Sequence, residues 1–266
     1  MLIDLDGTLV GKVGNVVCEY EVARLSGRKE LRAFKESLVA RLRYGIIRPH
    51  VHAFCKQSTP GLELFVYTAS DAAWAAFLVP CVEAALGFKF QRPIFTRAHC
   101  VGPENKKSLA GVRPAVFARL RRAYKLLPSA VRDLNMVLVD NTPDVMADPA
   151  EQASLVVCPT YSYAYYYDVL GRVDVDTLHR RFARFVPCLT QVGLFPAAAA
   201  APKSYQEFAA VYYRMLGAAL ADTYAGNAVA LTSDHFWARM LQITARVTTF
   251  DADTVRSVNA ALRKKR

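Results

Sequence analysis

The stretch Asp4-Leu5-Asp6-Gly7-Thr8-Leu9-Val10 directly follows Leu2-Ile3, an apolar pair typical of a buried strand. Side chains two positions apart on a strand point the same way, so the carboxylates of Asp4 and Asp6 are expected to face one site. Gly7 then allows the chain to turn sharply. Paired carboxylates at a strand exit indicate catalysis or metal binding. The pattern alone is equally compatible with a helix cap or a metal-free turn.

Two further apolar runs end in oxygen-rich turns. Leu64-Phe65-Val66-Tyr67 leads into Thr68-Ala69-Ser70, and Met136-Val137-Leu138-Val139 leads into Asp140-Asn141-Thr142-Pro143-Asp144. Both runs predict strands of a parallel sheet, because such strands are buried on both faces. Sites in open α/β sheets form at the carboxyl ends of the strands, so the three turns are expected to meet. Alternatively, the hydroxyl residues cap the helix that begins near Asp71, and the acidic turn is an ordinary one.

The residue types suit phosphoryl transfer. An aspartate such as Asp4 accepts a phosphoryl group well, which splits one difficult displacement into two easier ones. Asp6 can protonate the leaving oxygen and later deprotonate a water molecule. Mg2+ prefers oxygen ligands and bridges carboxylates to phosphate. The acid and amide of Asp140 and Asn141 suit a second set of ligands for that ion.

In this order, the motifs resemble those of the haloacid dehalogenase superfamily of phosphohydrolases. Shorter matches narrow the resemblance to the branch that contains the RNA polymerase II carboxy-terminal-domain phosphatases and the small phosphatases related to them, over about residues 1–168. The resemblance implies a Rossmann-like three-layer α/β sandwich with a central parallel sheet, and Mg2+-dependent dephosphorylation of phosphoserine or phosphothreonine in proteins. The matching stretches are Arg48-Pro49-His50-Val51-His52-Ala53-Phe54, Val66-Tyr67-Thr68-Ala69-Ser70, Arg97-Ala98-His99-Cys100, Lys107-Ser108-Leu109 and Val139-Asp140-Asn141-Thr142-Pro143.

The resemblance also implies a role for each matching residue. Asp4 is the nucleophile, and Asp6 is the acid and base that also offers its backbone carbonyl to the metal. Lys107 neutralises the phosphoryl charge; Lys106 is a rival, but Lys107 begins the Lys-x-Leu that matches the family's Lys-Asp-Leu. The implied catalytic residues are Asp4, Asp6, Thr68 and Lys107, the substrate-binding residues are Thr68, Ala69, Arg97 and Lys107, and the metal ligands are Asp4, Asp6, Asp140 and Asn141.

The chain is predicted to divide into a phosphatase domain, residues 1–195, and a helical C-terminal extension, residues 203–266. An alanine run bracketed by Pro196 and Pro202 is the expected linker. The extension carries no recognised chemistry and is expected to pack on the core or on a second copy, so an oligomer through these helices is one prediction. Helical patterns cover residues 15–43, 72–86, 234–247 and 253–264, a shorter helix ends at Lys56, and the capping box Ser204-Tyr205-Gln206-Glu207 opens a helix to about Ala221.

The formal net charge of +11 is unevenly distributed. No acidic residue occurs between Glu104 and Asp133, whereas lysines and arginines accumulate in the basic segment, residues 106–132. Such a segment attracts polyanions, which predicts a phosphorylated protein or a nucleic acid as the partner. A solvated helix face is the alternative.

The six cysteines are scattered without a CxxC pair, which indicates reduced thiols and an intracellular protein, nuclear or cytoplasmic. No membrane association is expected: no secretory signal precedes the first motif, and prolines interrupt the uncharged stretch from Phe185 to Pro202. Two alternatives to a protein phosphatase stay open. One is a phosphatase of nucleic-acid ends or small molecules, and the other is a catalytically silent binding protein, against which the intact motifs argue.

Overall fold

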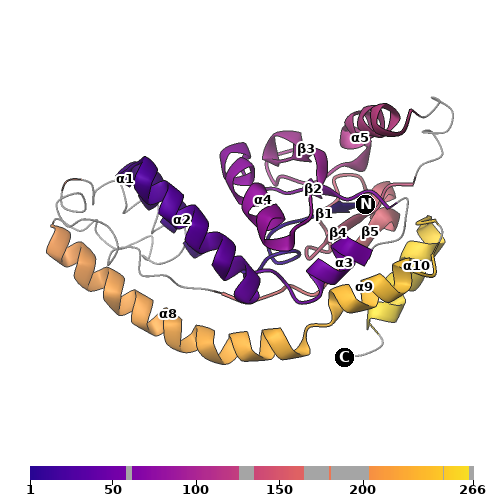
Figure 1. Ribbon diagram of the computed structural model, residues 1–266. Coiled ribbons are helices and arrows are strands. Elements are labelled where there is room, and N and C mark those ends of the chain that lie inside the picture. The colour runs from indigo at the N-terminus through magenta and orange to yellow at the C-terminus, as the bar shows by residue number, and fades with distance from the viewer. Residues whose placement is uncertain (58–61, 126–134, 165–179, 181–203, 248, 264–266) are drawn as a thin grey trace. The chain divides into compact units, whose positions relative to one another are not determined.

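The computed structural model describes residues 1–57, 62–125, 135–164, 180, 204–247 and 249–263 (Figure 1). The chain forms two compact units, each assembled from separate segments. The sheet unit comprises Met1–Val10, Ile47–Tyr161 and Asp234–Arg266, and the helical unit comprises Gly11–Ile46 and Ser162–Ser233. The expected linker, residues 196–202, lies outside the described residues. The division at that point therefore stays a prediction.

A five-stranded parallel sheet with the order β3-β2-β1-β4-β5 forms the centre of the sheet unit, with helices on both sides. The three strands expected from their apolar runs are confirmed, and the α/β class with them. The sequence did not single out β3, where exposed Arg92 and Pro93 interrupt the apolar pattern, nor the three-residue β5. The strands are β1 (Leu2–Ile3), β2 (Phe65–Tyr67), β3 (Gln91–Phe95), β4 (Leu138–Asp140) and β5 (Leu155–Val157).

The expected helices of the sheet unit are present with small shifts in their ends. The carboxylate of Asp71 accepts a hydrogen bond from the backbone N–H of Trp74 at 2.8 Å and caps α4. The alternative in which Thr68 or Ser70 caps this helix is therefore wrong. The helices are α3 (Val51–Gln57), α4 (Ala72–Leu86), α5 (Leu109–Tyr124), α9 (Phe236–Thr244) and α10 (Ala252–Arg263), with short 3-10 turns at Arg97–His99 and Pro149–Ser154.

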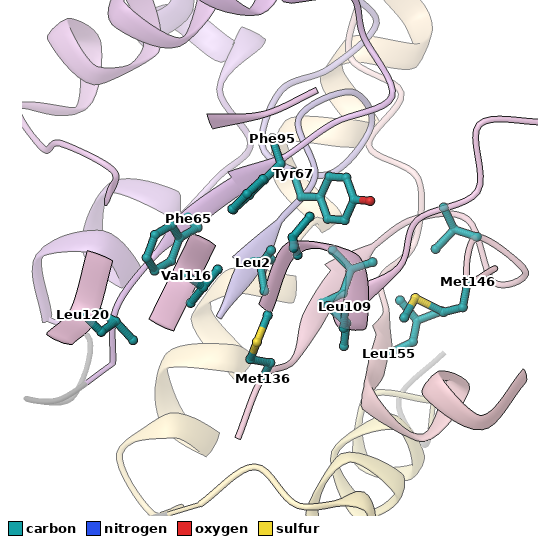
Figure 2. Packing of buried hydrophobic residues seen from close by; sticks show 13 residues of the cluster. Leu2, Phe65, Tyr67, Phe95, Leu109, Val116, Leu120, Met136, Met146 and Leu155 are labelled. Carbon is teal, nitrogen blue, oxygen red and sulfur yellow. The ribbon is translucent and has the colours of Figure 1, made fainter. Parts of the chain in front are cut away.

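One hydrophobic cluster joins α5 to the sheet (Figure 2). Leu109, Val112, Val116 and Leu120 recur at helical spacing and place one face of α5 in this cluster. They pack with strand residues including Leu2, Phe65, Leu138 and Leu155. Full burial of such a side chain stabilises the fold by roughly 1.5 to 3 kcal/mol. The cluster therefore anchors α5, whose first residue, Leu109, lies two positions after Lys107.

The last two helices belong to the sheet unit. Helix α9 packs on α3, and α10 packs on β5. Asn259 of α10 accepts a hydrogen bond from the backbone N–H of Val157 at 3.0 Å and donates one to the carbonyl of Leu155 at 2.8 Å. These bonds satisfy backbone groups of β5 at the edge of the sheet. The expected packing on the core is thus confirmed for α9 and α10, and binding of a second copy stays a prediction.

The helical unit contains α1 (Gly14–Ser26), α2 (Arg28–Arg41), a turn of π-helix (Leu42–Ile46) and α8 (Tyr205–Ser233). The single helix expected over residues 15–43 is broken at Gly27, whose φ of 139° lies in a region that favours glycine. Arg41 and Glu19 form a buried ion pair at 2.8 Å between α1 and α2. Ser204 caps α8 as expected, and the helix continues beyond Ala221 to Ser233. Among the described residues, no helix combines the length and apolarity needed to cross a membrane.

Candidate active site

The strand register brings the three polar turns together. Ile3 of the central strand lies opposite Val66 of β2 on one side and Val139 of β4 on the other. The next residue, Asp4, donates its backbone N–H to the carbonyl of Val139 at 3.0 Å. Asp4 and Asp140 are consequently neighbours at the same edge of the sheet. Parallel pairing thus produces the meeting of turns that the sequence predicted.

Lys107 lies between these two carboxylates. Its Nζ donates to Oδ1 of Asp4 and to Oδ2 of Asp140, both at 2.6 Å, and only 1% of the lysine side chain is exposed. Its backbone is held by Val145 and Ala147, with an N–H donated to the first and a carbonyl accepting from the second, both at 2.8 Å. The lysine therefore enters the site from a loop that is tied to the chain just after β4.

Burial and neighbouring charges have opposite effects on the pKa values of Asp4 and Lys107. Burial raises the pKa of Asp4 to about 7, although the Lys107 ammonium opposes that rise. Burial alone would lower the pKa of Lys107, but the carboxylates of Asp4 and Asp140 outweigh it, and the net direction is upward. The lysine is therefore a permanent positive charge at neutral pH, placed where a phosphoryl group would contact Asp4.

Lys106, the rival lysine, lies at the surface. Its Nζ donates to the backbone carbonyl of Asp144 at 2.5 Å and to its carboxylate at 3.2 Å, and it lies 3.6 Å from a Glu104 oxygen. Among the described residues, the ion pairs of Lys106 are with Glu104 and Asp144 and not with Asp4. The geometry thus supports Lys107, and not its neighbour, as the lysine of the site.

Asp6 has two chemically different carboxylate oxygens. Oδ2 accepts a hydrogen bond from the hydroxyl of Ser70 at 2.9 Å. Oδ1 is buried and has no hydrogen-bond partner within the part of the chain that the structure describes. Burial raises the pKa of Asp6, and the Ser70 hydrogen bond opposes that rise. A carboxyl group with one held and one available oxygen is suited to exchanging a proton with a bound ester.

Gly7 is required for two reasons. Its φ of 73° favours glycine, and a Cβ at this position would come within 2.9 Å of Nδ2 of Asn141. The Asn141 amide is held at both ends, because its Oδ1 accepts from the Thr8 hydroxyl at 3.2 Å and its Nδ2 donates to Oγ1 of Thr160 at 3.1 Å. The turn after β1 and the turn after β4 are therefore packed directly against each other.

The side chains of Asp4, Asp6, Lys107, Asp140 and Asn141 line a cavity of about 340 Å³, which is large enough for a phosphoryl group and part of its ester. Arg97 lies at an exposed position of this cavity, where its Nε donates to the carbonyl of Ala69 at 2.8 Å. The structure brings together every site residue predicted from the sequence. The lining residues are Asp4, Asp6, Thr68, Ala69, Ser70, Arg97, Lys107, Asp140, Asn141, Thr142 and Val145.

The donor set fits Mg2+. Asp4, Asp140 and Asn141 offer carboxylate and amide oxygens, which are the ligands that this ion prefers. Within the described residues, no group of three or more aspartate, glutamate, histidine or cysteine side chains is arranged so that it could hold a metal ion. Mg2+ usually keeps several waters and takes only one or two protein carboxylates together with substrate phosphate. The chemistry of the cavity therefore fits the ion.

Two residues make contacts in the site that the sequence did not predict. The hydroxyl of Ser70, which the sequence offered as a helix cap, donates to Asp6. Tyr67 accepts a hydrogen bond from the Ser108 N–H at 3.1 Å, and its ring lies 5.5 Å from the Lys107 ammonium. No local pattern marks either role, because each depends on segments that meet only after the sheet has formed.

The basic segment lies mainly beside the cavity rather than in it. Helix α5 starts two residues after Lys107 and carries Arg121 and Arg122, both exposed, in its last turn. At ~1.5 Å per residue, these arginines lie about 18 Å along the helix from its start. Arg119 donates to Oε1 of Gln91 at 3.0 Å. Residues 126–134, which include Arg132, lie outside the described residues.

A family model provides an independent comparison. The model of NLI interacting factor-like phosphatases matches residues 1–168. Searches among curated proteins and among solved structures gave no match. The matched segment is more than half of the chain and contains every predicted site residue, which confirms the resemblance seen in the motifs. The chain therefore belongs to the NLI interacting factor-like phosphatases, which are phosphoric monoester hydrolases of the haloacid dehalogenase type.

Proposed function

We propose that this phosphatase hydrolyses phosphoserine or phosphothreonine in proteins, requires Mg2+, and forms an aspartyl-phosphate on Asp4. The observation that carries the proposal is the Lys107 ammonium, 2.6 Å from both Asp4 and Asp140 in a buried setting. A carboxylate nucleophile needs a fixed positive charge beside it when a phosphoryl dianion approaches. Preorganised charge of this kind stabilises a transition state strongly because it does not have to reorganise.

In the first step, an oxygen of Asp4 attacks the phosphorus and the bond to the serine or threonine oxygen breaks. Asp6 gives its proton to that leaving oxygen, a role that its raised pKa favours. Thr68, buried at the exit of β2, offers a hydroxyl to a phosphoryl oxygen, and Lys107 neutralises the charge.

In the second step, Asp6 removes a proton from a water molecule as the water oxygen attacks the phosphorus. The bond between phosphorus and Asp4 breaks and inorganic phosphate leaves, so that Asp4 is again a carboxylate and Asp6 is again protonated. Asp4, the backbone carbonyl of Asp6, Asp140 and Asn141 would hold Mg2+, which when bound neutralises phosphoryl oxygens and orients them for displacement.

A protein substrate is supported by the surroundings of the cavity. Arg97 is exposed at the cavity, and the exposed arginines at the end of α5 lie too far away to touch a small ester. The distant arginines add attraction for a long polyanionic ligand, whereas Arg97 can attract any phosphate ester at the cavity. A nucleic-acid end would use the same charges, so the substrate panel must separate the two classes.

The test is a panel of phosphopeptides, 3′- and 5′-phosphorylated oligonucleotides and sugar phosphates, assayed with wild-type protein and with Asp4→Asn. Turnover of phosphopeptides above the other esters, dependence on Mg2+ and loss of nearly all activity in the variant are expected. Beryllofluoride should bind at the Asp4 carboxylate of the wild-type protein. Substantial activity in Asp4→Asn would exclude the covalent route, and preference for oligonucleotides would exclude the protein substrate.

An intracellular location, nuclear or cytoplasmic, belongs to the same proposal. The free thiols of Cys100 and Cys158 support it, because thiols persist in reducing compartments. Localisation of a fluorescent fusion would test this part separately.

A further inference from the structure

The turn after β1 is held by residues near the end of the chain. Trp237 of α9 is completely buried, and its indole Nε1 donates to the backbone carbonyl of Thr8 at 3.2 Å. Nη1 of Arg48 lies 3.5 Å from the same carbonyl, and Nε of this arginine donates to Asp234 at 2.8 Å. A carbonyl in the turn that carries Asp6 thus has two donors, and one of them comes from α9.

Thr8 links this contact to the proposed metal site. Its side chain is fully buried, and its hydroxyl donates to Oδ1 of Asn141 at 3.2 Å. Because Nδ2 of Asn141 is bound by Thr160, the amide has one orientation, in which Oδ1 keeps one lone pair for another partner. A shift of the Thr8 backbone would therefore move the hydroxyl that orients this oxygen.

We infer that Trp237 is a positioning residue that sets the Mg2+ affinity of Asn141 through Thr8. The inference rests on the proposed function, in which Asn141 is a metal ligand. Residues that hydrogen-bond to a metal ligand and so orient it typically weaken metal affinity 10- to 100-fold when they are mutated. Helix α9 lies beyond residue 168, where the family match ends, yet it belongs to the same compact unit as the site. The working site would then include a helix outside the matched segment.

The first experiment compares Trp237→Phe with Met240→Ala. Both remove buried volume from α9, but only the first removes the donor to Thr8. Calorimetric titration should show a Kd for Mg2+ raised about tenfold or more in Trp237→Phe and unchanged in Met240→Ala, with both melting temperatures lowered. At saturating Mg2+, Trp237→Phe should regain most of the wild-type kcat. An unchanged Kd in Trp237→Phe would refute the inference.

A second measurement needs no variant of Trp237. The chain has two tryptophans, so 15N-labelled indoles give two assignable resonances. The Trp237 indole N–H should shift on Mg2+ titration with the calorimetric midpoint, and Thr8→Val, which lacks the hydroxyl, should abolish the shift while Thr8→Ser keeps it. If the wild-type protein binds Mg2+ but the chemical shift of the Trp237 indole N–H does not change, the positioning role is refuted. Failure of the wild-type protein to bind Mg2+ at all would instead refute the proposed function.

Discussion

The Asp4→Asn variant should be more stable than the wild-type protein at alkaline pH when Mg2+ is absent. Burial raises the pKa of Asp4 in the folded protein, so the folded state holds this proton more tightly than the unfolded chain does. Stability from this group is complete below the unfolded pKa of 3.8 and is lost as the pH rises to about 7. Asparagine imitates the protonated carboxyl group and does not titrate, so the variant should not suffer this loss.

The magnitude follows from the two pKa values. The interval from 3.8 to about 7 corresponds to about 4 kcal/mol, at ~1.4 kcal/mol per pH unit. Only 7% of Asp4 is exposed, so water screens little of this effect. In the wild-type protein Lys107 stays charged throughout this range, because its pKa lies above its ordinary value. The gain at pH 8 is thus expected to approach ~4 kcal/mol and to be small at pH 4.

The assay is urea unfolding of both proteins at pH 4, 6 and 8 in the presence of a chelator. The free energies of unfolding should diverge as the pH rises, and adding Mg2+ at pH 8 should stabilise the wild-type protein more than the variant, because the ion favours the ionised carboxylate. Asp253→Asn removes an exposed carboxylate of α10 and should keep the wild-type profile. Parallel profiles for wild type and Asp4→Asn would refute the reasoning.

Three further predictions concern activity. Asn141→Ala should raise the Mg2+ concentration needed for the half-maximal rate, with little change in melting temperature. Ca2+ should bind to the wild-type protein yet support little turnover, because its looser coordination misplaces the attacking group. Activity that resists a chelator would contradict both expectations. Lys107→Met should lower kcat at least about 100-fold on every ester, whereas Lys106→Met should stay near wild type; equal losses would exclude the assigned lysine. Arg121→Glu combined with Arg122→Glu should slow hydrolysis of a long acidic phosphopeptide but spare para-nitrophenyl phosphate, and raising salt should mimic it; equal loss on both substrates would indicate damaged folding.

Several elements and site residues could be predicted from the sequence because their signals are local. Asp4, Thr68 and Asp140 each follow a short apolar run, and buried parallel strands have that pattern. Parallel strands end at one edge of the sheet, so three strand exits imply one site without any knowledge of strand order. The helix break at Gly27 and the cap at Asp71 also follow local rules, although the patterns predicted one helix across Gly27 and offered Thr68 or Ser70 as the cap.

Other parts of the site depend on contacts that no local pattern encodes. Lys107 follows no apolar run, and only its place in a motif marked it. Its burial comes from backbone pairing with Val145 and Ala147, 38 and 40 positions later in the chain. The hydrogen bond from Ser70 to Asp6 likewise joins turns from two strands, which become neighbours only when β1 and β2 pair.

The sequence by itself determined the α/β class, the three strand exits and the chemical groups at them, since strand burial and residue type are both local properties. Only the tertiary structure decided that Trp237 of α9 reaches the carbonyl of Thr8, 229 positions earlier. An amphipathic helix has an apolar face whatever it packs on, so its sequence does not identify its partner. The partner is decided by where the sheet, α3 and α9 come together, and that depends on the connectivity of the whole unit.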